Sequence, residues 1–231
     1  MATKTAEDTR ARILEAAAAL LAAEGRDGLS TRAVSAAAGV QPPALYRLFG
    51  DKDGLLDAVA AYGFDEYLKS KRALGSTGDA VEDLRRGWDL HIEFGLSRPE
   101  FYVLMYGDAR PGHTSPAARE AETMLRSIVE RVAAAGRLRV GVERAARLVH
   151  ATGVGVVLAL IATPEQDRDP QLSPTARETV LTRILTESEK AGGSDLPQRA
   201  IALRAGLREA TALTEAERVL LAEWLDRIAN A

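Results

Sequence analysis

The chain has 231 residues, of which 46% are hydrophobic and 27% are charged, and its formal net charge is −3. These values are ordinary for a globular protein and exclude a disordered or collagen-like chain. The absence of cysteine excludes disulfide frameworks, cysteine-type zinc sites and thiol catalysis.

Every periodic segment of the sequence has the helical spacing, and no run of alternating β-branched or aromatic residues is found. The sequence therefore predicts an all-α protein. The first helix is expected over residues 6–24, where Ile13, Ala17 and Leu21 recur at intervals of four and so share one face. Gly25 is its expected end.

Residues 31–49 read TRAVSAAAGVQPPALYRLF and predict two short helices joined by a tight turn. Val34 and Ala38 share one face of the first helix, and Gly39 follows where the chain must adopt a left-handed conformation to leave it. Leu45 is expected to face inward from the second helix. The outward face of that helix then carries Pro42, Ala44, Tyr46 and Arg47, a surface suited to the major groove of DNA.

Longer helices follow. One is expected from Asp51, which can cap it, to about Arg72, before the GSTG stretch at 75–78. Thr214 and Glu217 form the pattern of a capping box at the start of the last helix. The other helices are expected over residues 79–96, 98–107, 116–135, 141–162, 173–190 (with Ser173 as its cap), 198–210 and 214–228.

Charge alone does not indicate a DNA-binding protein. Residues 1–52 carry seven Lys or Arg and six Asp or Glu, which gives a net charge of only +1. Phosphate contacts in this segment must therefore come from a few well-placed cations, hydroxyl groups and helix N-termini.

The stretch from Gly28 to Ala61, with glycine and valine at the turn, then LYRLF and DKDGLL, resembles the signature region of the TetR family of transcription regulators. The resemblance implies a helix-turn-helix DNA-binding domain over residues 1–52 and a helical regulatory domain over 53–231. The chain departs from the usual pattern at Leu48, where many members carry His, and at Gln41, where Ser or Thr usually caps the helix.

The resemblance also implies which side chains contact the DNA backbone. It assigns phosphate contacts to Thr31, Tyr46 and Lys52. Their chemistry agrees, because a hydroxyl at a helix start, an outward phenol and an ammonium are all phosphate donors.

Base contacts are implied for the same region. Arg32 matches a base-reading arginine and can address guanine O6 and N7, while Gln41 can read adenine. Pro42 and Ala44 offer apolar contacts to thymine methyl groups. For Arg47 two interpretations stay open, a base contact and an arginine solvated on the helix surface.

The densest aromatic region lies after residue 80. It can line an apolar effector pocket, with His91 or Tyr106 as polar anchors, or it can be an ordinary core. The candidate ligand-binding residues are Trp88, His91, Phe94, Phe101, Met105, Tyr106 and His150.

The helix expected over 141–162 is rich in small residues such as Ala151, Gly155 and Ala159, which permit close approach between helices. In TetR-like proteins the last two long helices pair with their symmetry mates. Helices 141–162 and 173–190 are therefore the predicted homodimer interface, and packing within one chain is the alternative. The last two helices, 198–228, either extend the interface or cover the pocket.

Two features indicate the location of the protein. Its first residues lack the apolar core of a signal peptide, which predicts a cytoplasmic protein. The longest uncharged apolar stretch, residues 151–163, has 13 residues, fewer than the roughly 20 needed to span a bilayer, so no membrane role is expected.

The predicted function is a ligand-responsive repressor that binds a palindromic operator in double-stranded DNA as a homodimer. Its partners are the operator and a small-molecule effector, and no cofactor or metal is expected. The sequence contains no HExxH, GxSxG or Walker loop, so an enzyme is not expected. The alternative is a helical protein-interaction module without DNA binding.

Overall fold

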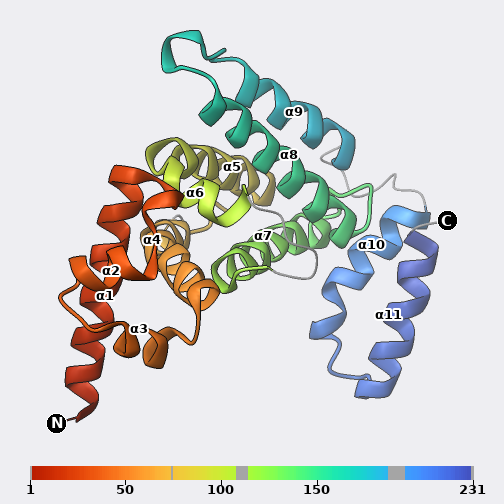
Figure 1. Ribbon diagram of the computed structural model, residues 1–231. Helices are drawn as coiled ribbons and strands as arrows, with labels where there is room; N and C mark the ends of the chain where they lie inside the picture. The colour runs from red at the N-terminus through yellow and green to blue at the C-terminus, as the bar shows by residue number, and fades with distance from the viewer. Residues whose placement is uncertain (1, 74, 108–113, 187–195, 230–231) are drawn as a thin grey trace. The chain divides into compact units, whose positions relative to one another are not determined.

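The computed structural model describes residues 2–73, 75–107, 114–186 and 196–229. These residues form eleven α-helices and three 3-10 turns (Figure 1). The described ranges contain no strand, and their only β feature is an isolated bridge between Leu138 and Leu185. The prediction of an all-α fold is therefore confirmed.

The helices keep the order expected from the sequence. Their bounds are α1 Ala2–Glu24, α2 Thr31–Ala37, α3 Pro42–Phe49, α4 Lys52–Ala73, α5 Ala80–Ser97, α6 Pro99–Tyr106, α7 Pro116–Ala134, α8 Val142–Ala162, α9 Leu172–Ile184, α10 Leu196–Gly206 and α11 Glu215–Ala229. The 3-10 turns are Arg26–Gly28, Glu165–Asp167 and Leu207–Glu209.

Local capping explains several of these boundaries. The carboxylate of Asp51 accepts the Gly54 amide at 2.7 Å, and that of Asp79 accepts the Val81 amide at 2.8 Å. Thr214 and Glu217 form the predicted capping box, with the Thr214 amide donating to the Glu217 carboxylate at 2.8 Å. Each cap satisfies backbone groups that the first turn of a helix leaves without a partner.

The prediction for α9 was wrong at both ends. The helix begins at Leu172 rather than at Ser173, and the Ser173 hydroxyl accepts a hydrogen bond from Trp88 Nε1 at 3.0 Å instead of capping it. It ends at Ile184, where backbone bonds to residues 137 and 139 draw the chain into the bridge with Leu138. These long-range bonds replace the helical bonds that local sequence favours, and residues 187–190 lie outside the described chain.

The boundaries of the next helix, α10, also differ from the prediction. The helix expected over 198–210 begins at Leu196, ends at Gly206 and continues as a 3-10 turn through Glu209. A tighter turn of this kind is common at the end of an α-helix.

The chain forms two compact units. Unit 1 comprises residues 1–73 and 93–121, and unit 2 comprises residues 74–92 and 122–231. The predicted functional division, into residues 1–52 and 53–231, stays a prediction.

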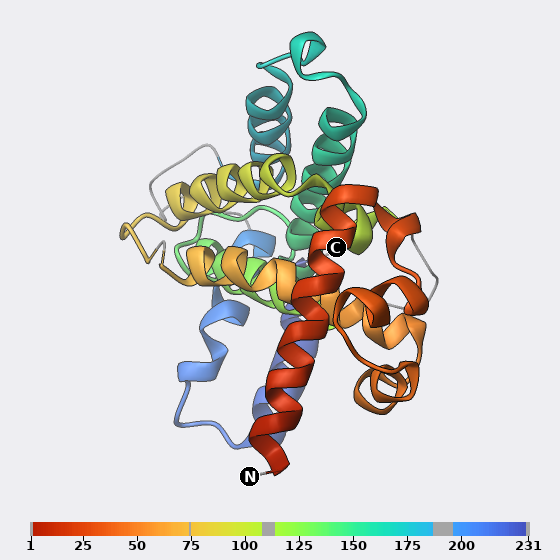
Figure 2. The ribbon, with the colours of Figure 1, turned by 60° about the vertical axis from the view of Figure 1, so that its left-hand side comes forward.

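In unit 1, α1 runs alongside α2 and α4, and α3 packs against α2 and α4 (Figures 1 and 2). Ile13, Ala17 and Leu21 of α1 are buried, as their spacing predicts. The largest fully buried side chains of this unit are Ile13, Leu21, Leu29, Leu45, Leu55, Phe64 and Tyr102.

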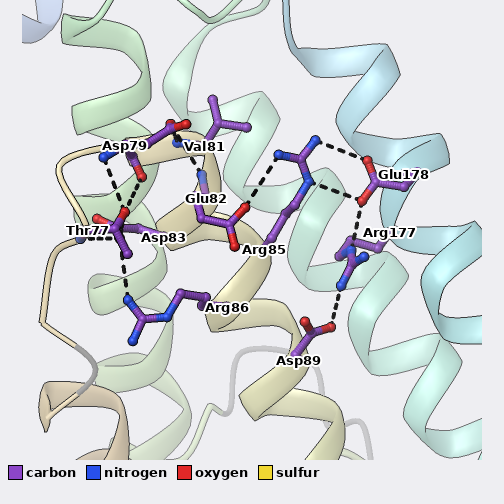
Figure 3. Close-up of polar contacts among 10 residues, drawn as sticks. All are labelled: Thr77, Asp79, Val81, Glu82, Asp83, Arg85, Arg86, Asp89, Arg177 and Glu178. Carbon is purple, nitrogen blue, oxygen red and sulfur yellow. Dashed lines mark hydrogen bonds and ion pairs between the residues drawn. The ribbon is translucent and has the colours of Figure 1, made fainter.

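Unit 2 is organised by α8 and α9, which pack against each other. A chain of ion pairs joins α5 to α9 (Figure 3): Arg85 contacts Glu178 at 3.2 Å, and Arg177 contacts both Glu178 at 2.9 Å and Asp89 at 2.5 Å. Trp88, which lies between Arg85 and Asp89 in the sequence, is buried, and its indole N–H donates a hydrogen bond to Ser173 on α9. Polar contacts and one buried indole thus fix the start of α9 on α5.

Asp83 is a buried acid of unit 2, with 4% of its surface exposed. Its carboxylate accepts hydrogen bonds from Thr77, from Ser76 and from Arg131 of α7. Burial acts to raise the pKa of this carboxyl, but these hydrogen bonds outweigh it and hold the pKa well below its ordinary value. Asp83 therefore binds the 75–79 loop and α7 to α5 as an ionised group.

Helix α8 is long and apolar enough, by length and composition alone, to cross a membrane. The prediction of no membrane role rested on the uncharged stretch 151–163 alone. A core helix meets the same criterion, so one such helix is weak support for a membrane span. One third of its most apolar stretch is buried inside the chain.

Candidate nucleic-acid interface

The turn between α2 and α3 has the geometry expected from its glycine. Gly39 has φ of +63°, in the left-handed region, as predicted. Its amide donates to the carbonyl of Ala36 at 3.2 Å, and the Val40 amide donates to the carbonyl of Ser35 at 3.0 Å. These two bonds form a Schellman motif, which ends α2 and redirects the chain within three residues.

The start of α3 is built from two prolines. Gln41 is extended, with φ of −80° and ψ of 144°, and makes no side-chain capping bond. Pro42 and Pro43 occupy the first turn, where a missing N–H leaves no helical bond unmade. Leu45 is fully buried, so the opposite face of α3 is turned outward.

The junction of α3 with α4 is tightly packed. Gly50, with φ of +81°, ends α3, and Asp51 caps α4. A Cβ atom on Gly54 would lie 2.1 Å from the carbonyl oxygen of Phe49, so the first turn of α4 approaches the end of α3 as closely as backbone atoms allow. Arg10 of α1 lies over the Phe49 ring, 5.3 Å from its centre.

The structure brings all eight predicted DNA-contact residues to α2, the turn, α3 and the first residue of α4 (Figure 1). Tyr46 has 48% of its surface exposed, so it is not a core residue. Arg32, Gln41, Pro42, Arg47 and Lys52 are also exposed, and Thr31 and Ala44 are half-buried. Sequence reasoning missed Arg10, whose contact with Phe49 spans 39 positions of the chain and leaves no local pattern.

Two of the four predicted effector residues of unit 1, Phe94 and Tyr106, belong to a cluster of rings. Phe94 is buried, with its ring centre 5.0 Å from that of Phe64, 4.8 Å from Tyr67 and 6.2 Å from Tyr102. The rings of Tyr102 and Tyr106 lie 4.8 Å apart. Of the other candidates, Phe101 is buried and Met105 is half-buried.

Lys71 was missed by sequence reasoning. It lies on α4, four residues after Tyr67, and its ammonium is 5.5 Å from the centre of the Tyr67 ring and 3.5 Å from the carbonyl oxygen of Ala121. Burial lowers the pKa of Lys71 to about 8. Burial also raises the pKa of the Tyr67 phenol. The spacing of Phe64, Tyr67 and Lys71 on one face of α4 was the signal available in the sequence.

The remaining effector candidates lie in unit 2. Trp88 is buried, and a Cβ atom on Gly153 of α8 would lie 3.4 Å from the His91 ring and 3.6 Å from the Trp88 ring. His150 lies 3.6 Å from Glu122 and lines a pocket of about 270 Å³ with Arg126 and Arg147. The seven candidates are thus divided between unit 1 and two places in unit 2.

Comparisons with known proteins start from the same segment. The family model described as "Bacterial regulatory proteins, tetR family" matches residues 13–59, which run from α1 through the turn into α4. No curated protein matches the chain.

Solved structures share the fold over most of the chain. A protein of unknown function from Rhodococcus sp. RHA1 is 28% identical, with 77% of this chain and 96% of that chain covered and a TM-score of 0.63. A TetR transcription regulator from Haloarcula marismortui is 20% identical, with 78% and 100% covered and a TM-score of 0.58. NalD, the secondary repressor of the MexAB-OprM multidrug efflux pump in Pseudomonas aeruginosa, is 22% identical, with 79% and 98% covered and a TM-score of 0.54.

The family match falls on the segment that contains the Gly39 turn and the exposed face of α3. The likeness in fold extends over about three quarters of the chain. Residues 13–59 are therefore a helix-turn-helix DNA-binding domain of the tetR family, and the chain has the fold of the TetR-family transcription regulators.

Proposed function

We propose that the chain is a ligand-responsive repressor that binds a palindromic operator as a homodimer in the cytoplasm. The observation that carries the proposal is the outward face of α3, with Tyr46 exposed beside the Gly39 turn, in a segment that matches the tetR family. A short helix presented in this way fits the major groove.

In the proposed complex, phosphate and base contacts are divided among the exposed residues. Thr31, Tyr46 and Lys52 donate to phosphates and so fix the position of α3 on the duplex. Arg32 and Gln41 read base edges in the major groove. Pro42 and Ala44 contact thymine methyl groups, and Arg47 is a further candidate for a base contact.

The proposed homodimer forms through α8 and α9. Leu148, Ala151, Gly155 and Ala159 are exposed, and the last three recur at intervals of four, so they share one face of α8. Small side chains on such a face allow two helices to approach closely. Association through this face would cover the part of α8 that the chain itself leaves unburied.

The effector is proposed to bind either among the candidates of unit 1 (Phe94, Phe101, Met105 and Tyr106) or among those of unit 2 (Trp88, His91 and His150). NalD is described as a repressor of a multidrug efflux pump. This supports a repressor role here, but it does not identify the effector. An apolar or aromatic small molecule fits the chemistry of the ring cluster.

The proposed mechanism is a shift in population between two arrangements of the dimer. Half-sites must lie about 34–36 Å apart, or a multiple of this distance, for the α3 helices of both subunits to bind. Helix α4 follows α3 closely in the chain. Effector binding that moves α4 therefore changes the distance between the α3 helices of the two subunits and weakens operator binding.

Selection of bound fragments from a random duplex library tests the proposal. A palindromic winner is expected, because a symmetric dimer reads the same half-site twice. The logarithm of the affinity for this DNA should fall linearly with the logarithm of the salt concentration, since counterions are released when the protein neutralises phosphates. A protein that selects no sequence and shows no salt dependence would instead be a helical protein-interaction module.

A further inference from the structure

The C-terminal helices α10 and α11 pack against each other as a hairpin (Figure 1). Ala200, Leu207 and Leu225 form its small buried core. Arg204 and Asp226 join the two helices through an ion pair of 3.2 Å. The hairpin therefore has a defined inner side, and its remaining surfaces can be located from the helical spacing.

One outer side of the hairpin faces the rest of unit 2. Ile201 of α10 and Asp226 of α11 line a pocket of about 240 Å³ together with residues of α7 and α8. Leu203 comes two residues after Ile201, and Trp224 two residues before Asp226, so each lies about 200° further around its helix. The opposite side of the hairpin thus carries Leu203, which is 54% exposed, and Trp224, which is 50% exposed.

On this opposite side, α11 presents a symmetric row of residues. Glu217, Leu220, Trp224 and Arg227 follow one another at spacings of three, four and three, so they lie on one face of the helix. All four are exposed, and Leu220 has 45% of its surface accessible. The row has the same spacing read in either direction, with an acid at one end and a base at the other.

This row is complementary to a copy of itself. When two such helices lie antiparallel, Glu217 of each faces Arg227 of the other, and Leu220 of each faces Trp224 of the other. A two-fold axis produces every contact twice, which is the property of an isologous interface. Parallel packing would instead place like charges opposite each other.

We propose that this face of α11 binds the same face of α11 in a second copy of the chain, with the two helices antiparallel. Trp224 is the apolar anchor, Leu203 of α10 widens the contact, and the Glu217–Arg227 pairs fix its direction. Tryptophan is enriched among the residues that contribute most to the affinity of protein interfaces. This surface is separate from the α8 face, so the inference does not rest on the homodimer proposed above.

The test compares full-length variants by sedimentation equilibrium at micromolar concentrations. Gly155→Arg places a charge on the exposed face of α8 and removes association through that face. In this background the chain should remain a dimer through α11. Adding Trp224→Glu should weaken the remaining association at least about tenfold. Val219→Glu is the matched control, because Val219 is also exposed but lies about 140° around α11 from Trp224.

The results separate this inference from the proposed homodimer. A mass lowered by Trp224→Glu but not by Val219→Glu, in either the wild-type or the Gly155→Arg background, supports the α11 contact. Equal masses for the two glutamate variants in both backgrounds overturn it. If Gly155→Arg changes no mass in the Trp224→Glu background, the α8 interface fails instead. Circular dichroism of every variant verifies that the helices are retained.

Charge reversal tests the direction of packing. Arg227→Glu alone and Glu217→Arg alone each place like charges opposite each other, so each should associate more weakly in the Gly155→Arg background. Glu217→Arg also removes the capping box, so Thr214→Ala, which weakens that box and keeps both charges, is its control. An equimolar mixture of the two variants pairs opposite charges at both ends and should recover the association of the parent. Failure of the mixture to recover it overturns the antiparallel arrangement.

Discussion

Tyr46 and Arg32 are both exposed in the DNA-binding domain, yet their substitution is expected to affect DNA binding in different ways. Tyr46→Phe removes a phosphate donor and should weaken binding about tenfold on every sequence. Arg32→Ala should lose about 1–3 kcal/mol of discrimination at one base pair. Titration of both variants against operator and random DNA at one salt concentration measures the difference. Equal losses on both DNAs for the two variants would contradict the assignment.

Asp83 is expected to link stability to pH. Because its folded pKa lies below its unfolded value, it stabilises the protein above the unfolded pKa of about 4, and this contribution declines as the pH falls toward the folded value. Asp83→Asn should therefore lower the free energy of unfolding at pH 7 by about 1–3 kcal/mol, since Arg131 and Thr77 lose a charged acceptor.

Urea unfolding at pH 7 and pH 3 measures this effect, and the difference between Asp83→Asn and the wild type should be smaller at pH 3. Glu82→Gln is a suitable control, because the neighbouring Glu82 is exposed and its pair with Arg85 is 3.8 Å long. A difference that stays constant between the two pH values would show that the Asp83 carboxylate contributes no pH-dependent stability.

At the scale of the elements, Gly39 in the α2–α3 turn and Gly54 in α4 are expected to resist substitution for different reasons. Gly39→Ala places a side chain at positive φ with no atom within 4 Å, so the cost is that of the backbone alone, about 1–2 kcal/mol. Gly54→Ala sets a methyl group against the Phe49 carbonyl and must displace α4 from α3. Only this second change should alter the presentation of α3 and weaken DNA binding by more than the loss of stability explains.

Melting temperatures and operator affinities measured on the same samples distinguish the two substitutions. Gly206→Ala is the control, since its backbone is helical and nothing lies within 4 Å. If both Gly39→Ala and Gly54→Ala reduce affinity only in proportion to the unfolded fraction, the close approach of α4 to α3 has no role in recognition.

The elements that the sequence predicted correctly are those with local determinants. The Gly39 turn, the Asp51 cap and the Thr214 capping box depend on residues within a few positions of one another, so their patterns can be read directly. The end of α9 depends on bonds to residues more than 40 positions away, and no local signal marks it. For the same reason the exposed face of α3 was predicted, whereas the contacts of Arg10 and Lys71 were not.

At the scale of the whole molecule, operator binding should depend on dimerisation through α8. Gly155→Arg introduces a charge where no atom lies within 4 Å of the chain itself, so the fold should tolerate it. Binding to a two-half-site operator should weaken at least about tenfold, because both half-sites no longer engage together. Glu165→Arg, an exposed charge reversal, is the control. Equal operator affinities for the two variants, measured by fluorescence anisotropy, would argue against the α8 interface.

The lowered pKa of Lys71 has a chemical consequence of its own. At pH 7.5 about a quarter of the molecules carry a neutral amine at this position, against roughly a thousandth for an ordinary lysine. The chain has only five lysines, so brief treatment with an acylating dye should label Lys71 before the other four, and peptide mapping would separate it from the α-amino group, whose ordinary pKa is also about 8. Lys71→Arg should lose the fast phase of lysine labelling. The emission of the attached dye would then change when a ligand binds near the surrounding rings or when those rings rearrange.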